Sequence, residues 1–282
     1  MRPLISVDEL LPRLGAADLC VIDARFSLAD TEAGRRAYRA SHLPGAVYLH
    51  LDEDLSGPLA AHGGRHPLPA PEAAAATFGR AGVGPDTHVV AYDDGDGMVA
   101  SRVWWLLRWL GHERVQVLDG GLAAWRAAGG PETDAAPDVE ARPFHPEPRA
   151  SLLVDRTWLL EHLADPDVTV IDARAAERYR GEVEPIDPRA GHVPGARNLP
   201  FAENLHEGRF KDADALRERF AHVAHAPTLV VYCGSGVSAA HDLLALELAG
   251  VRHARLYAGS WSDWVSYPDA PVATGEEPGV PT

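Results

Sequence analysis

Cysteine is scarce in this chain: among 282 residues there are only Cys20 and Cys233. Two cysteines so far apart do not form the disulfide framework of a small secreted domain. The sequence also lacks the CxxC pairs and His/Cys clusters that hold zinc. We therefore expect no metal and no cofactor, and a reducing compartment, the cytoplasm.

Basic residues are outnumbered: 26 lysines and arginines face 41 acidic residues, which gives a formal charge of −15. Nucleic acid binding needs a basic face, so we expect no nucleic-acid partner and attribute most of this charge to a solvated surface. No apolar run approaches the ~20 residues of a membrane helix. The N-terminal MRPLISVDELL has no basic segment followed by an apolar one, so the sequence predicts neither a membrane partner nor a signal peptide.

The chain contains an internal repeat: four segments occur twice, in the same order. The pairs are VIDAR at 21–25 and 170–174, HLPGA at 42–46 and HVPGA at 192–196, HVVAYDDG at 88–95 and LVVYCGSG at 229–236, and LDGGLAAW at 118–125 and LYAGSWSDW at 256–264. Two long copies indicate two homologous domains rather than a solenoid, and the chain is long enough for both.

The segment between the copies, residues 129–149, is rich in proline, glycine and acidic residues and has no apolar period. Such a composition is typical of an extended linker. We predict an N-terminal domain at 1–130, a linker at 131–149 and a C-terminal domain at 150–282.

Within each copy, short β-branched runs alternate with longer helical patterns. This alternation predicts an α/β fold in which a parallel sheet carries helices on both faces. Ligands of such sheets bind at the carboxyl ends of the strands, and Cys233 directly follows the predicted strand at 229–232.

Two features of the repeat point to structure rather than chemistry. Cys20 precedes an apolar strand with no glycine loop nearby, so we expect a buried structural cysteine. Asp23 and Asp172 end the two VIDAR strands, and we expect them to fix nearby backbone or to pair with Arg25 and Arg174.

The loop after the strand at 229–232 can stabilise an anion on sulfur. Gly234 and Gly236 can adopt backbone angles that other residues avoid, so we expect the loop to curl around Cys233 with several N–H groups pointing inward. The end of a helix that starts near 238 or 239 adds positive charge, and both effects favour thiolate over thiol. Ser235 and Ser238 could each donate a hydroxyl hydrogen bond to a persulfide; Ser238 could instead cap the helix.

The CGSGVSA loop, the duplicated VIDAR and H[LV]PGA segments and the terminal LYAGSWSDW resemble the tandem-domain rhodanese sulfurtransferases over nearly the whole chain. The resemblance implies two rhodanese domains, with catalysis in the second. It also implies a ping-pong reaction in which a small-molecule donor loads sulfur onto Cys233 as a persulfide. An acceptor such as cyanide, a thiol or reduced thioredoxin then removes it.

The first copy departs from this pattern, because Asp93 or Asp94 stands where the second has its cysteine. A carboxylate cannot carry sulfur, and the three acids of DDGD would repel an anionic donor. We therefore expect the N-terminal domain to be catalytically silent.

The loop also bears on the choice of donor. Residues Gly234 to Ser238, with Val237 between them, carry no charge and are similar to the CG[SA]GVTA loop of mercaptopyruvate-using members. Thiosulfate-using members tend to have basic residues there, which suit a dianion. We favour 3-mercaptopyruvate, while thiosulfate remains the alternative donor for the same mechanism.

A carboxylate-bearing donor needs a cation, preferably arginine. The resemblance implies that Arg178 contacts substrate and that Arg189, which precedes the GHVPG motif, does so too. It also implies that His42 acts with Ser235 in a proton relay. The alternative for His42 is a structural role in the turn before Pro44, which the matching position of His192 favours.

Two other classes of protein compete with this interpretation. A phosphatase of the same fold needs arginine six residues after the cysteine, and Ala239 stands there. A non-catalytic binding module usually lacks the cysteine, as the first copy does and the second does not.

Overall fold

The computed structural model describes residues 1–280 and divides the chain into two compact units. Unit 1 consists of Met1–Gly57, Pro69–Arg149 and Glu207–Phe210. Unit 2 consists of Pro58–Leu68, Ala150–His206 and the chain from Lys211 onward. The units thus differ from contiguous domains in two short exchanged segments, and the predicted linker at 131–149 packs with unit 1, where Arg142 N donates to Gly79 O.

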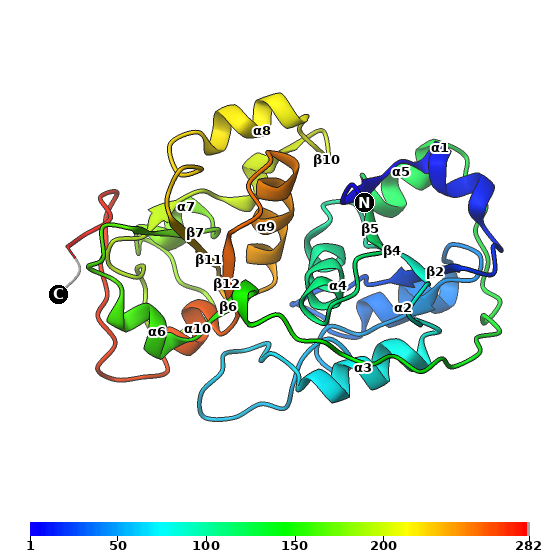
Figure 1. The fold of residues 1–282 in the computed structure, drawn as a ribbon, viewed down its shortest axis with the longest axis horizontal. Coiled ribbons are helices and arrows are strands. Elements are labelled where there is room, and N and C mark those ends of the chain that lie inside the picture. The colour runs from blue at the N-terminus through cyan, green and yellow to red at the C-terminus, as the bar shows by residue number, and fades with distance from the viewer. Residues whose placement is uncertain (281–282) are drawn as a thin grey trace. The chain divides into compact units, whose positions relative to one another are not determined.

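Unit 1 is built on a five-stranded parallel sheet with the strand order β1-β5-β4-β2-β3 (Figure 1). The β-branched runs predicted as strands form its centre and are buried, as expected for strands covered on both faces. In chain order the strands are β1 (Leu4–Ile5), β2 (Leu19–Asp23), β3 (Val47–Tyr48), β4 (His88–Tyr92) and β5 (Val115–Leu118).

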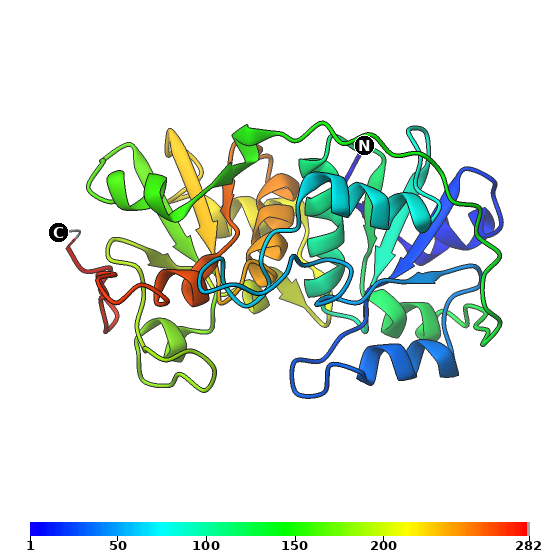
Figure 2. The ribbon, with the colours of Figure 1, turned by 90° about the horizontal axis from the view of Figure 1, so that it is seen from below.

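Helices cover both faces of this sheet (Figure 2). One core cluster joins the strands to α1 and α5, while α4 packs against β4 and β5. The helices are α1 (Val7–Leu10), α2 (Ala33–Ala40), α3 (Pro71–Arg80), α4 (Met98–Trp109) and α5 (Gly121–Ala127), with a 3₁₀ turn η1 at Leu11–Arg13.

Unit 2 repeats this plan with the strand order β6-β12-β11-β7-β8, again parallel. Its sheet strands are β6 (Leu153–Val154), β7 (Val168–Asp172), β8 (Arg197–Asn198), β11 (Thr228–Tyr232) and β12 (Arg255–Tyr257). A separate two-stranded sheet pairs β9 (Leu205–His206) of unit 2 with β10 (Arg209–Phe210), which belongs to the exchanged segment of unit 1. The helices are α6 (Arg156–Glu161), α7 (Ala176–Tyr179), α8 (Ala213–Phe220), α9 (Ser238–Leu248) and α10 (Ser260–Trp264), with 3₁₀ turns η2 (Ala150–Leu152) and η3 (Phe201–Asn204). The predicted α/β fold with helices on both faces of each sheet is confirmed.

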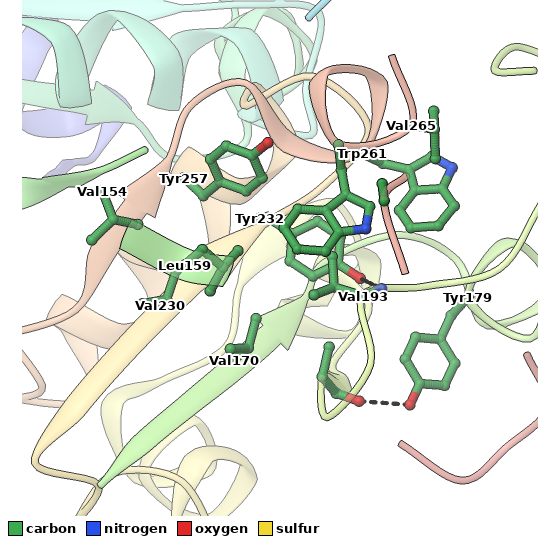
Figure 3. Packing of buried hydrophobic residues seen from close by; sticks show 13 residues of the cluster. Val154, Leu159, Val170, Tyr179, Val193, Val230, Tyr232, Tyr257, Trp261 and Val265 are labelled. Carbon is green, nitrogen blue, oxygen red and sulfur yellow. Dashed lines mark hydrogen bonds between the residues drawn. The ribbon is translucent and has the colours of Figure 1, made fainter. Parts of the chain in front are cut away.

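The core of unit 2 packs aromatic rings against the end of β11. Figure 3 shows Tyr232 and Trp261 close together, with the Tyr232 hydroxyl accepting from Val193 N at 3.0 Å. The Tyr179 hydroxyl donates to Ala196 O at 2.7 Å. Because buried tyrosine hydroxyls here have partners, the rings add apolar area without an unsatisfied polar group. The strand that precedes Cys233 is thereby fixed.

Both units contain the predicted ion pair at the end of the VIDAR strand. Arg25 binds Asp23 at 2.7 Å and Arg174 binds Asp172 at 2.6 Å, and all four side chains are buried. Each arginine also donates to a main-chain carbonyl, of Ser41 and Gly191 respectively. Removing one partner of such a pair costs about 3–5 kcal/mol, so these residues serve the fold.

No helix in the described part of the chain is long and apolar enough to cross a membrane.

Candidate active site

Cys233 lies directly after β11 and before α9, at the carboxyl edge of the sheet of unit 2. Its side chain is 1% exposed, and Gly236 N donates to its Sγ at 3.1 Å. Gly236 has φ +78°, and a Cβ there would lie 2.4 Å from Ala258 O. The loop therefore needs glycine at this position both for its backbone angle and for its close approach to Ala258.

Ser260, which the sequence analysis did not single out, also contacts Cys233. Its hydroxyl accepts from Cys233 N at 3.1 Å and lies 4.0 Å from Sγ. Its φ is +55°, a left-handed conformation that is costly for serine, and the matching residue of unit 1 is Gly121 with φ +52°. A serine in a backbone position suited to glycine, in the copy that has the cysteine, indicates a role for its hydroxyl.

The last two loop residues, Val237 and Ser238, lie at the start of α9. Val237 is the N-cap residue of α9 and is buried, and Ser238 is the first helical residue. The alternative that Ser238 caps the helix is therefore wrong. The positive end of this eleven-residue helix faces the loop that holds the sulfur.

A segment far away in the sequence completes the surroundings of the loop. We call residues 58–68 the strap: they lie between β3 and α3 in the chain, yet belong to unit 2. The strap places His66 Nδ1 2.7 Å from Ser235 Oγ, and both side chains are buried, at 5% and 6% exposed. Ser235 thus has a histidine partner, and that partner is His66.

His42, the predicted partner of Ser235, lies elsewhere. It belongs to unit 1, where its Nδ1 bonds to Tyr38 O at 2.7 Å and its Nε2 to Ala135 O at 3.2 Å. Its main chain pairs with Thr133, and its ring stacks on Tyr38. His192 has the corresponding contacts in unit 2, with Tyr179 and Ala273. The pairing of His42 with Ser235 is thus replaced by that of His66, because both nitrogens of His42 are engaged by main-chain carbonyls.

Two guanidinium groups border the loop. A Cβ on Gly234 would lie 3.1 Å from Arg65 Nη2 and 3.5 Å from Arg178 Nη1. Arg178 was predicted to face the substrate, whereas Arg65 comes from the strap and was missed. The loop itself has no charged residue, but the side chains of Arg65 and Arg178 bring two positive charges next to it.

Two buried carboxylates hold these arginines. Arg178 donates to Glu184 at 2.7 Å and to Asp187 at 3.2 Å, and Arg65 donates to Asp187 at 2.6 Å. Burial raises the pKa of Asp187, although Arg65 acts in the opposite direction. Burial also tends to raise the pKa of Glu184. The hydrogen bond from Arg178 acts in the opposite direction, and the pKa of Glu184 lies below its usual value. The carboxylates orient the guanidinium groups and balance their charge before a ligand arrives.

Arg189 is the third predicted arginine. Its carbonyl accepts from Trp261 Nε1 at 2.9 Å, and Trp261 N in turn donates to Cys233 O at 2.9 Å. Its Nη1 is buried and has no hydrogen-bond partner among the described residues. A buried N–H without a partner costs free energy, and an anionic group that accepts from this nitrogen would remove that cost.

One group of side chains in unit 1 has the composition of a metal site. Ligand atoms of Glu32, His50 and Glu53 lie within 4.8 Å of one another. His50 Nε2 bonds to Thr31 O at 2.9 Å and its Nδ1 accepts main-chain N–H groups, while Arg35 pairs with Glu53. The ligand atoms of His50 and Glu53 thus already have partners within the protein, so the group does not fit a cation site.

The matching loop of unit 1 follows β4 and carries Asp93 where unit 2 has Cys233. The Asp93 carboxylate accepts four main-chain N–H groups, from Gly95, Gly97, Val99 and Ala100, at 2.9 to 3.1 Å. Burial and then the neighbouring Asp96 raise the pKa of Asp93 to about 6, against the action of these donors. The loop is an anion cradle filled by a side chain of its own.

Replacing Asp93 by alanine should destabilise unit 1 and create a site for an oxyanion. Four N–H groups would lose their acceptor, at ~1–3 kcal/mol each. Removal of a buried carboxylate whose pKa is raised to about 6 offsets only part of this cost. We expect urea unfolding at pH 7 to show a net loss of stability, partly restored by sulfate.

The wild type provides the control for this variant, because sulfate stabilises most proteins to some extent. The stabilisation by sulfate should be larger in Asp93→Ala than in the wild type at equal ionic strength. Equal stabilisation in both proteins would show that the four N–H groups do not form an open cradle.

Comparisons with known proteins agree with this arrangement. The Rhodanese-like domain family matches residues 6–128 and 155–267. A protein of Pseudomonas aeruginosa named "Probable 3-mercaptopyruvate sulfurtransferase" is 48% identical over 279 residues, which cover 97% of this chain and 98% of the relative. The thiosulfate sulfurtransferase of Rattus norvegicus is 34% identical over 98% of this chain and 96% of its own.

Among solved structures, the crystal structure of SseA from Escherichia coli, described as a 3-mercaptopyruvate sulfotransferase, superposes with a TM-score of 0.83. It is 33% identical and covers 93% of this chain and all of its own. The chain therefore belongs to the rhodanese family and is a sulfurtransferase.

Proposed function

We propose that the enzyme moves sulfur from 3-mercaptopyruvate to a thiophilic acceptor through a persulfide on Cys233. The observation that supports this most is one buried thiol that accepts an N–H from its own loop, while two guanidinium groups border that loop at Gly234. The amide and the helix end stabilise the anionic sulfur, and the guanidinium groups attract the donor's carboxylate.

The first half-reaction uses these groups in order. The Cys233 thiolate attacks the thiol sulfur of the donor, the carbon–sulfur bond breaks, and its electron pair leaves as the enolate of pyruvate. The donor's thiol proton ends on the enolate carbon, which leaves Cys233 as a persulfide anion and releases pyruvate. The 2.7 Å contact between Ser235 Oγ and His66 Nδ1 supports a proposed role of these two side chains in passing this proton.

The second half-reaction returns the enzyme to its starting state. The acceptor, such as cyanide or a thiol, attacks the outer persulfide sulfur, and the Cys233 thiolate leaves. Splitting the transfer into two steps lets a donor and an acceptor that never meet exchange sulfur. We include reduced thioredoxin among the proposed acceptors. The cytoplasm is the proposed location, since both cysteines are free thiols.

Thiosulfate is the second candidate donor, by the same mechanism. The relative in Rattus norvegicus that is named for it supports this candidate, and a guanidinium fork binds a sulfonate as well as a carboxylate. Mercaptopyruvate is favoured because Arg65 and Arg178 are already paired with Glu184 and Asp187. The net charge of these four groups is close to zero, which suits a monoanion better than a dianion.

Unit 1 is proposed to be catalytically silent. Its loop presents the Asp93 carboxylate to the amides that an anionic sulfur would need, and a carboxylate has no sulfur to transfer.

The deciding experiment compares catalytic efficiency for mercaptopyruvate and thiosulfate with cyanide as the common acceptor. It is combined with mass spectrometry of the enzyme after donor alone. We expect one extra sulfur atom on Cys233 and a higher kcat/KM for mercaptopyruvate. Turnover without any sulfur on Cys233 would refute the proposed intermediate. A higher kcat/KM for thiosulfate would show that thiosulfate, and not mercaptopyruvate, is the preferred donor.

A further inference from the structure

The strap is fixed to unit 2 by three polar side chains from one short stretch of chain. Asp263 Oδ1 accepts from Gly63 N at 2.7 Å, and Ser262 Oγ accepts from Arg65 N at 3.0 Å. Ser266 Oγ bonds to His62 Nδ1 at 2.8 Å. These contacts hold the strap on both sides of Gly64, next to the two residues that face the cysteine loop.

The approach of the strap is close. A Cβ on Gly64 would lie 2.4 Å from Gly259 O, and the ring of His62 stacks on Tyr267 at 3.8 Å between centroids. The Asp263 carboxylate is buried and also accepts from the Tyr257 hydroxyl at 2.6 Å, which fixes its orientation. A buried carboxylate whose oxygens each have a donor is preorganised to bind the strap.

The internal repeat shows what unit 1 has at the same positions. The register of α5 and α10 is fixed by equivalent bonds: Leu122 N donates to Asp93 O as Trp261 N donates to Cys233 O. In the same way, Trp125 Nε1 donates to Pro131 O and Trp264 Nε1 to Pro271 O.

In this register the three polar residues that bind the strap correspond to alanines. Ser262, Asp263 and Ser266 match Ala123, Ala124 and Ala127. The polar side chains therefore occur in the copy that contains the cysteine. They are absent from the copy whose loop carries Asp93.

We propose that Ser262, Asp263 and Ser266 are positioning residues that dock the strap and so determine the reactivity of Cys233 toward anionic donors. Their side chains bond to the strap, and they act through Arg65 and His66; the main-chain N–H of Ser262 also donates to Gly234 O at 2.9 Å, a bond that an alanine keeps. The inference rests on the proposed function for the identity of the donor. The docking itself can be measured without any donor.

The test replaces all three residues by the alanines of unit 1, in the full-length enzyme. Trypsin should cleave the Arg65–His66 bond at least ~10-fold faster, because local opening exposes it. The ratio of Cys233 alkylation rates by iodoacetate and by iodoacetamide should fall about 5-fold, since a displaced Arg65 no longer attracts the anionic reagent. With mercaptopyruvate, kcat/KM should fall ~100-fold, with KM rising as well as kcat falling.

Ser151→Ala is the matched control, because Ser151 is exposed in unit 2 and outside the strap contacts. Wild-type protection from trypsin together with a wild-type alkylation ratio in the triple variant would overturn the proposal. If the triple variant does not fold, Ser262→Ala alone removes one strap hydrogen bond. The alkylation ratio and the rate of trypsin cleavage in that variant then test the proposal. A wild-type enzyme that never acquires sulfur on Cys233 would refute the proposed function while leaving the trypsin result intact.

Discussion

Replacing Cys233 by serine should abolish sulfur transfer and leave the fold intact. Serine keeps an acceptor for the Gly236 N–H and fits the same space, so the loop retains its hydrogen bond. A hydroxyl is far less nucleophilic and cannot carry a sulfane sulfur, so we expect turnover to fall by at least ~10⁴-fold. The measurements are steady-state turnover with cyanide, mass spectrometry after donor, and circular dichroism.

Cys20→Ser is the matched control, since it removes the other cysteine. Cys20 is buried in unit 1, donates its S–H to Ala81 O at 3.1 Å, and has its pKa raised to about 12 by burial. A buried thiol of this kind is inert, so the variant should keep its activity and its persulfide. If instead Cys233→Ser still turned over donor, or Cys20→Ser lost its persulfide, sulfur would have to travel by another route.

The parts of this structure that the sequence predicts are those fixed by local patterns. TLVVY forms β11, a helix begins at Ser238, and the loop between them curls because Gly236 has a positive φ. Each of these features depends on residues within a few positions of one another. The strands, the helices and the position of Cys233 could therefore be predicted from the chain itself.

The strap could not be found in this way. Residues 58–68 have no hydrophobic period, and their position depends on Asp263 and on Ser262, which lie far along the chain. Arg65 and His66 were missed for this reason. One available signal was the comparison of the two copies, in which Asp263 stands against Ala124 at an otherwise similar helix.

The same comparison separates the histidines. His42 and His192 occupy matching positions in the two copies and make the same contacts: to a main-chain carbonyl, to a tyrosine ring and to a residue with which each forms an isolated β-bridge. A feature present both in the copy with Cys233 and in the copy with Asp93 is expected to serve the fold they share. Asp263, Ser260 and Cys233 differ between the copies, and we expect such differences to mark residues that serve the proposed chemistry of unit 2.

Replacing Arg178 by alanine should raise KM for mercaptopyruvate by about 10- to 50-fold and lower kcat much less. The guanidinium borders the loop at Gly234 and is expected to bind the donor's carboxylate, which does not change during sulfur transfer. Such an interaction stabilises the ground state and the transition state equally, so its loss appears in KM. Its removal also frees the charges of Glu184 and Asp187, which would then repel the donor.

Arg180→Ala is the control for this variant, because Arg180 lies two residues away and pairs with Glu182 at the surface. It should leave both constants close to those of the wild type, since exposed ion pairs contribute little. Arg178→Lys should fall between the two, as lysine restores the charge without the two-point contact. Unchanged KM in Arg178→Ala, or a loss confined to kcat, would mean that the donor's carboxylate binds elsewhere. Arg189, with its unpartnered Nη1, would then be the next residue to replace.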